Sequence, residues 1–166
     1  MTINRRASTG LAVIALALAV APTAMGQRPE REPLPPSDPF VIEDICSFPV
    51  LLEELVNRAT ITRFSDGREK ITGTLKIRLT NVDEPRKSRV FNISGPAHFR
   101  PTADGGVVLK GTGRWLWFFV PGELGEGTSG MMMLLSGHAR LTISPEGELS
   151  FTVVGGRAQD VCTLLA

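Results

Sequence analysis

Apolar and polar residues alternate with a period of two along most of the chain beyond Phe40, in short runs separated by Gly, Asp, Asn and Pro. This pattern predicts β-strands that bury one face, because successive side chains of a strand point to opposite sides. Residues 70–80 are the clearest case: Ile71, Leu75 and Ile77 share one face, while threonine, lysine and arginine occupy the other. We therefore predict a strand there with one dry face and one wet face.

Further strands are predicted wherever the same alternation recurs between turn residues. They cover residues 58–64, 88–94, 98–100, 107–120, 131–135, 137–144 and 149–154. Residues 50–57 fit a strand or a short helix, because the adjacent Glu53 and Glu54 match neither pattern. Short turns between sequential strands favour antiparallel pairing, and closure of the sheet would remove exposed edges. We therefore expect an all-β, single-domain antiparallel up-and-down barrel of about seven or eight strands, with a β-sandwich as the alternative.

The N-terminal part of the chain has a different composition. Two arginines precede an apolar run over residues 11–21, and small residues follow it, so we expect residues 1–26 to be a signal peptide. An uncleaved membrane anchor is the alternative, although a span needs about 20 apolar residues. Residues 27–39 contain five prolines and alternating charge, which predicts a flexible linker. Residues 40–166 are then the β-barrel domain.

Signal cleavage would leave a chain of almost no net charge. The full sequence has 18 Lys and Arg and 17 Asp and Glu, and two of the arginines lie in residues 1–26, which leaves 16 basic and 17 acidic residues. A near-neutral surface exerts no bulk attraction on nucleic acid or anionic lipid, and such binding would require a local patch. We therefore expect no nucleic-acid partner, and no membrane span after cleavage.

The two cysteines of the chain, Cys46 and Cys162, lie at opposite ends of the β-patterned segment. Behind an export signal, such a pair predicts one structural disulfide that clasps the domain. A redox-active pair usually has a close C-x-x-C spacing, and a metal site needs more ligands than two. We therefore expect a secreted, extracytoplasmic protein.

No set of residues in the sequence points to catalysis. The serines lie outside a G-x-S-x-G motif, His98 and His138 have no evident partner, and most acidic residues fall in predicted turns. The run Met131-Met132-Met133 suggests copper, but neighbouring side chains of a strand point to opposite faces and cannot converge on one ion. We therefore expect no catalytic residue, no metal and no cofactor, and we favour a non-enzymatic protein over an enzyme.

Trp115 and Trp117 stand on one face of the strand predicted at residues 107–120, and the opposite face is apolar too. A strand that is apolar on both faces crosses a two-sided core, binds a ligand or partner, or packs against another layer. Gly111 and Gly113 share the tryptophan face and would make room for a large side chain. Core packing, a ligand-lined cavity and an exposed platform for a sugar therefore all remain open.

If the barrel holds a cavity, its candidate ligand-binding residues divide into apolar liners and groups for a polar head. The liners are Trp115, Trp117, Phe91, Phe99 and Met133, and the polar groups are Arg78, Arg140 and His138. The expected function is then binding of a small apolar or amphipathic molecule.

Two alternative functions remain. One is a solid-barrel structural or interaction protein of the cell envelope, which would make contact through residues 121–130 or the proline-rich segment. The other is a cofactor-free isomerase or cyclase, for which Glu53 and His138 are the available groups.

Four segments carry a resemblance to known proteins. They are Glu43-Asp44-Ile45-Cys46-Ser47-Phe48-Pro49-Val50, Asn92-Ile93-Ser94-Gly95-Pro96, Pro121-Gly122-Glu123-Leu124-Gly125 and Gly156-Arg157 with Asp160-Val161-Cys162. This pattern resembles a group of small secreted actinobacterial proteins of unknown function, over nearly the whole mature chain. A more distant likeness, of architecture alone, is to eight-stranded barrels of the lipocalin and allene-oxide-cyclase type. Neither resemblance supplies a catalytic residue, because fold alone does not imply function.

Overall fold

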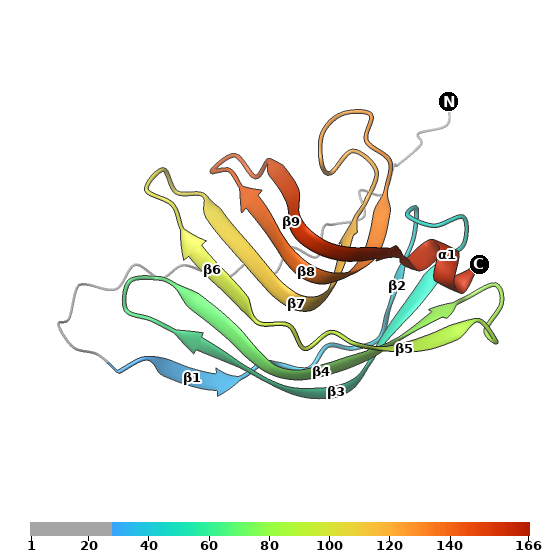
Figure 1. Cartoon of the computed structure of the whole chain (residues 1–166), viewed down its shortest axis with the longest axis horizontal. Helices are drawn as coiled ribbons and strands as arrows, with labels where there is room; N and C mark the ends of the chain where they lie inside the picture. Colours follow the sequence, from blue (N-terminus) through green and yellow to red (C-terminus); the bar gives the residue numbers. More distant parts are fainter. Residues whose placement is uncertain (1–27) are drawn as a thin grey trace, which may run out of the picture.

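A computed structural model describes residues 28–166, so the expected signal peptide lies outside the described residues. Nine strands form one antiparallel sheet in the order β1-β3-β4-β6-β7-β8-β9, with β2 paired to β3 and β5 paired to β4 (Figure 1). The elements are β1 (Glu30–Pro33), β2 (Phe40–Ile42), β3 (Val50–Arg63), β4 (Glu69–Asn81), β5 (Ser88–Asn92), β6 (Ala97–Pro101), β7 (Val107–Phe119), β8 (Met131–Ile143), β9 (Leu149–Asp160) and the short helix α1 (Val161–Leu165). The predicted all-β antiparallel class is confirmed.

The sheet is not closed into a barrel. One end of the strand order is formed by β1 and β2 beside β3, the other by β9, and no strand pair in the described part of the chain joins the two ends. The sheet bends instead, so that β7, β8 and β9 lie over β3 and β4 in Figure 1. Both β5 and β6 pair with β4, which makes the sheet branch where a simple meander would continue. The predicted closure of the barrel is therefore not confirmed, and the observed form is one curved, open sheet.

Two apolar clusters form the core, one on each face of β8. The first joins the two halves of the sheet, because it contains Val50 and Leu79 from β3 and β4 together with Leu134 from β8 and residues of α1. The second lies on the other face of β8, where Leu135 packs with aromatic residues of β7 and β9. Since neighbouring residues of a strand point to opposite faces, β8 is buried on both sides. This explains its continuous apolar start, MMMLL.

The predicted disulfide joins Cys46, which follows β2, to Cys162 in α1, with 5.3 Å between the two Cα atoms. The helix is anchored beside it, because the side chains of Val161 and Leu165 are fully buried in the first cluster. The bridge thus joins the C-terminal helix α1 to the segment between β2 and β3, and the predicted disulfide is confirmed.

Several elements differ from the sequence prediction. Residues 50–57 are strand, and a bulge between Glu54 and Val56 leaves Leu55 unpaired, which accounts for the broken alternation there. Residues 30–33 of the expected flexible linker pair with β3 as an edge strand. The last strand continues to Asp160, six residues beyond the predicted end.

Candidate functional site

Four basic residues stand in one row across four neighbouring strands. Lys70 on β4 pairs directly with His98 on β6, His98 with Lys110 on β7, and Lys110 with Arg140 on β8. Residues that are directly paired across an antiparallel sheet put their side chains on the same face. We call Lys70, His98, Lys110 and Arg140 the basic row; it runs across β4, β6, β7 and β8, which are labelled in Figure 1.

Threonines continue the basic row at both of its ends. Thr62 on β3 pairs with Lys70, and Thr152 on β9 pairs with Arg140. Neighbouring strands lie about 4.8 Å apart, so the four basic residues extend over about 14 Å. The row therefore presents basic groups at regular intervals, with hydroxyl groups beyond them and no carboxylate among them.

The basic row borders an open hollow of about 600 Å³. Arg68 and Arg100 add two further cationic groups to its lining, and the apolar part of the lining comes from Phe64, Phe99 and Val108. Three members of the row, His98, Lys110 and Arg140, are exposed to solvent, whereas Lys70 is half-buried. We call this space the basic hollow; it offers cationic groups and apolar surface side by side.

No acidic partner neutralises the basic row. Within residues 28–166, none of the ion pairs includes one of its four members, and their side chains make no hydrogen bond. Like charges in directly opposite positions of a sheet destabilise it. An arrangement that is unfavourable for folding and lacks compensating carboxylates is the feature expected of an anion-binding surface.

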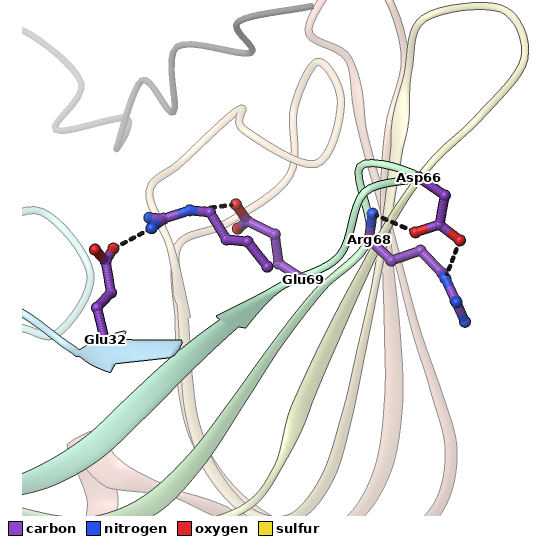
Figure 2. Close-up of polar contacts among 5 residues, drawn as sticks. Glu32, Asp66, Arg68 and Glu69 are labelled. Carbon is purple, nitrogen blue, oxygen red and sulfur yellow. Dashed lines mark hydrogen bonds and ion pairs between the residues drawn. The ribbon is translucent and has the colours of Figure 1, made fainter. Parts of the chain in front are cut away.

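The one carboxylate in the lining of the basic hollow, that of Glu69, is engaged elsewhere. Glu69 directly precedes Lys70 on β4, so its side chain points to the face of the sheet opposite the basic row. There, Arg63 Nε donates a hydrogen bond to Glu69 Oε1 at 3.0 Å. The same guanidinium donates to Glu32, and Figure 2 shows it bridging the two carboxylates. The hydrogen bond to Glu32 holds the pKa of Arg63 above its ordinary value, against desolvation by burial and with help from Glu69. The acidic groups of this region therefore belong to a separate network.

Arg68, in contrast, already has an anionic partner. Its Nε donates to Asp66 Oδ2 at 2.6 Å, and its backbone N–H donates to Oδ1 of the same residue (Figure 2). Partial desolvation would raise the pKa of Asp66, but these hydrogen bonds and the charge of Arg68 bring it below its ordinary value. The guanidinium also lies over the Phe64 ring, 5.2 Å from the centroid. Arg68 is thus held at the edge of the basic hollow, and the row itself supplies the free cationic groups.

The two tryptophans lie in the second apolar cluster and not in the basic hollow. Their ring centroids are 5.9 Å apart, and Trp117 packs at 4.9 Å against Phe151 of β9. A Cβ atom at Gly111 would lie 2.8 Å from Trp117 Cζ2, so this glycine makes the expected room for the indole. Both indole N–H groups are buried without a hydrogen-bond partner in the described residues. The aromatic stripe of β7 therefore packs as core.

The other residues predicted to bind a ligand are spread over the molecule. Phe99 and Arg140 both line the basic hollow, while Met133 packs with the tryptophans. Phe91 packs against the first apolar cluster, and Arg78 lies 3.6 Å from Glu53 in an ion pair. His138 is exposed on β8, opposite Thr112. The structure thus brings together two of the eight predicted residues, Phe99 and Arg140, at the basic hollow.

Sequence reasoning did not find Lys70 and Lys110 as site residues, and it considered His98 only as a catalytic group. Alternation places each of these residues on the polar face of its strand. What it does not give is the pairing of β4 with β6, because β5 lies between them in sequence and pairs with β4 as well. The register of non-adjacent strands was the missing signal.

Among residues 28–166, no group of three or more His, Cys, Asp or Glu side chains is arranged to hold a metal ion. A second hollow, also of about 600 Å³, lies beside the disulfide and is lined by Met131, Met132 and Met133 together with Asp160.

No helix of the described segment combines the length and the apolar character needed to cross a membrane.

The comparisons with known proteins identify no relative of this chain. No protein-family model, no curated protein and no solved structure matches it. The resemblance to small secreted actinobacterial proteins therefore stays a prediction, and the basic row and its hollow are the features from which a function is argued.

Proposed function

We propose that this protein is an exported, non-enzymatic binding module that holds an anionic ligand in the basic hollow. The observation that carries the proposal is the basic row: Lys70, His98, Lys110 and Arg140 are directly paired across four strands without a carboxylate partner. Anions compensate such a row by charge-assisted hydrogen bonds, which are about twice as strong as neutral ones.

The lining of the basic hollow supports a ligand with an apolar part as well. Val108 presents half-buried apolar surface on the same face of β7 as the exposed Lys110, and Phe99 lines the hollow from the opposite face of β6. Binding sites commonly combine apolar walls with a few polar groups that fix orientation, in spaces of about 300–1,000 Å³. The proposal thus keeps the binding module expected from the sequence and assigns it a ligand that is chiefly anionic.

Export is supported by the disulfide between Cys46 and Cys162. Disulfides persist in oxidising compartments and are rare in the reducing cytosol. Together with the signal-like segment expected in residues 1–26, the bridge favours an extracytoplasmic site of action.

The test is isothermal titration calorimetry of the disulfide-bonded protein with sodium tripolyphosphate at low ionic strength. The double variant Lys110→Gln/Arg140→Gln should bind at least about tenfold more weakly, because hydrogen bonds to charged groups contribute about 1.5–3 kcal/mol each. The matched control is Arg114→Gln/Arg157→Gln, which removes the same charge from exposed positions of β7 and β9 outside the basic hollow.

When the titration is repeated at about 0.15 M ionic strength, the control variant should bind within about twofold of the wild type, since exposed charges farther apart than the Debye length of about 8 Å are screened by salt. Equal weakening in both double variants would show attraction by net charge alone, and no binding by the wild type would refute the proposed function.

A further inference from the structure

The dimensions of the basic row distinguish between kinds of anion. Its four members span about 14 Å, because each strand adds about 4.8 Å. A single phosphate, sulfate or carboxylate is small enough to reach only two neighbouring members at once. A compact anion would therefore leave part of the row uncompensated, whereas a chain of anionic groups would engage all of it.

The course of the row also fixes how such a chain would lie. The members are successive partners on β4, β6, β7 and β8, so a line through them runs across the strands and not along one of them. The hydroxyl groups of Thr62 and Thr152 extend the same line beyond both ends. We propose that the basic row is the binding site of a linear acidic polysaccharide that lies across the sheet; this inference rests on the proposed function.

Three observations favour a polysaccharide over a nucleic acid. A linear acidic glycan places anionic groups at intervals of one sugar unit, a length of the same order as the strand spacing of about 4.8 Å, so such a chain can reach successive members of the row. The terminal threonines offer hydroxyl groups, which pair with sugar hydroxyls as both donors and acceptors. Residues 27–166 have 16 basic and 17 acidic residues, so the protein lacks the overall positive charge typical of a nucleic-acid-binding domain.

The apolar lining agrees with this class of ligand. Val108 lies on the face of the row and is half-buried, and Phe99 projects from the opposite face of β6, so the lining offers limited apolar contact. Arg68 lies over one face of the Phe64 ring, 5.2 Å from the centroid, and competes with a base for stacking on that face. Single-stranded nucleic acids rely on free stacking platforms. The surface is therefore suited to a chain of charged sugars.

The test compares mono-, tri- and hexagalacturonate, which have one carboxylate per sugar, in titrations with the disulfide-bonded protein. Affinity should rise from the monomer to the trimer and again to the hexamer, because only the last covers the whole row. The logarithm of the association constant for the hexamer should fall with the logarithm of salt concentration with a slope of about −2 to −3, for three or four compensated charges. Polyphosphate and a single-stranded oligonucleotide of equal charge serve as competing probes.

Single variants locate the chain along the row. Lys70→Gln and Arg140→Gln, at its two ends, should each weaken the hexamer about threefold or more and reduce the salt slope by about 0.7. Arg114→Gln, outside the basic hollow, should change neither quantity. Thermal melting of each variant shows whether it is folded, and all three substitutions are at positions that are exposed or half-buried.

Each outcome bears on a different part of the inference. Equal affinity for monomer and hexamer, with tripolyphosphate still bound at the row, would overturn the polymer and leave the proposed function standing. Tighter binding of polyphosphate or of the oligonucleotide than of the hexamer would overturn the assignment to a polysaccharide. If none of the anions binds to the protein, tripolyphosphate included, the proposed function itself is refuted.

Discussion

Removal of the disulfide should cost this domain a large part of its stability. The bridge between Cys46 and Cys162 joins residues that are 116 positions apart. In the chain-entropy model, a cross-link over a loop of this length destabilises the unfolded chain by about 4.8 kcal/mol at 25 °C. Domains of this size are stable by about 5–15 kcal/mol in total. We therefore expect Cys46→Ser and Cys162→Ser each to lower the free energy of unfolding by about 3–5 kcal/mol.

The assay is equilibrium unfolding in guanidinium chloride, followed by tryptophan fluorescence. The two tryptophans are suitable probes, because Trp115 and Trp117 both belong to the second apolar cluster. The dependence of the unfolding free energy on denaturant should steepen in the variants, since an unfolded chain without the cross-link exposes more surface.

The reduced wild-type protein and the double serine variant are the controls, and both should coincide with the single variants. The helix that carries Cys162 keeps its own packing, because Val161 and Leu165 remain buried. A loss of less than about 1 kcal/mol would refute the reasoning, since it would mean that the loop is already constrained in the unfolded state. Single variants that differ from each other by more than this would show that a local contact of one cysteine dominates.

Three further substitutions, at Gly156, Asn81 and Lys110, test the packing and the basic row; the first and the last each have a matched control. Gly156→Ala should destabilise by about 2 kcal/mol or more in denaturant titration, because its φ is +118° and the new Cβ would lie 2.3 Å from a carbonyl oxygen of β8. Gly155→Ala, where a Cβ meets nothing within 4 Å, should stay within about 0.5 kcal/mol of wild type; equal effects would contradict the geometry. Asn81→Ala should lower stability by about 2–3 kcal/mol in the same titration, because the buried amide accepts two backbone N–H bonds and donates to the last turn of α1. Lys110→Thr should raise the melting temperature at low salt, because it relieves about 0.2–1 kcal/mol of repulsion between Lys110 and its directly paired basic neighbours. The control is Lys76→Thr, since Lys76 is paired with neutral residues only and its replacement should give no such gain. A gain for Lys110→Thr that persists unchanged at high salt would contradict the electrostatic cause.

Local periodicity predicted most strands of the sheet well. The alternation in residues 70–80 corresponds to β4, and the strands predicted at residues 88–94 and 98–100 correspond to β5 and β6. The pattern failed where tertiary contacts decide the conformation: Gly155-Gly156 has no apolar alternation, yet it continues β9 because β8 pairs with it. The helix α1 is only five residues long and depends on burial of two of them, for which the sequence has no periodic signal.

The candidate site illustrates the same limit at longer range. The polar face of each strand is visible in the sequence, and Arg140 and Phe99 were named as binding residues. Their neighbours in space depend on which strands pair and in which register. Here β6 pairs directly with residues 69–71 of β4, although β5 lies between the two strands in sequence and pairs with residues 76–80 of β4. A pattern of period two carries no information on this choice, because it repeats identically for every register that differs by two residues.

The most direct test of the basic row is to map its ligand by NMR. Backbone amide shifts of the isotope-labelled, disulfide-bonded protein would be followed during titration with hexagalacturonate. The account predicts that the saturable shift changes centre on Lys70, His98, Lys110 and Arg140 and extend to Thr62 and Thr152, which lie in one line across the sheet. Changes centred on the tryptophan cluster or on the hollow beside the disulfide, with the row unaffected, would contradict it.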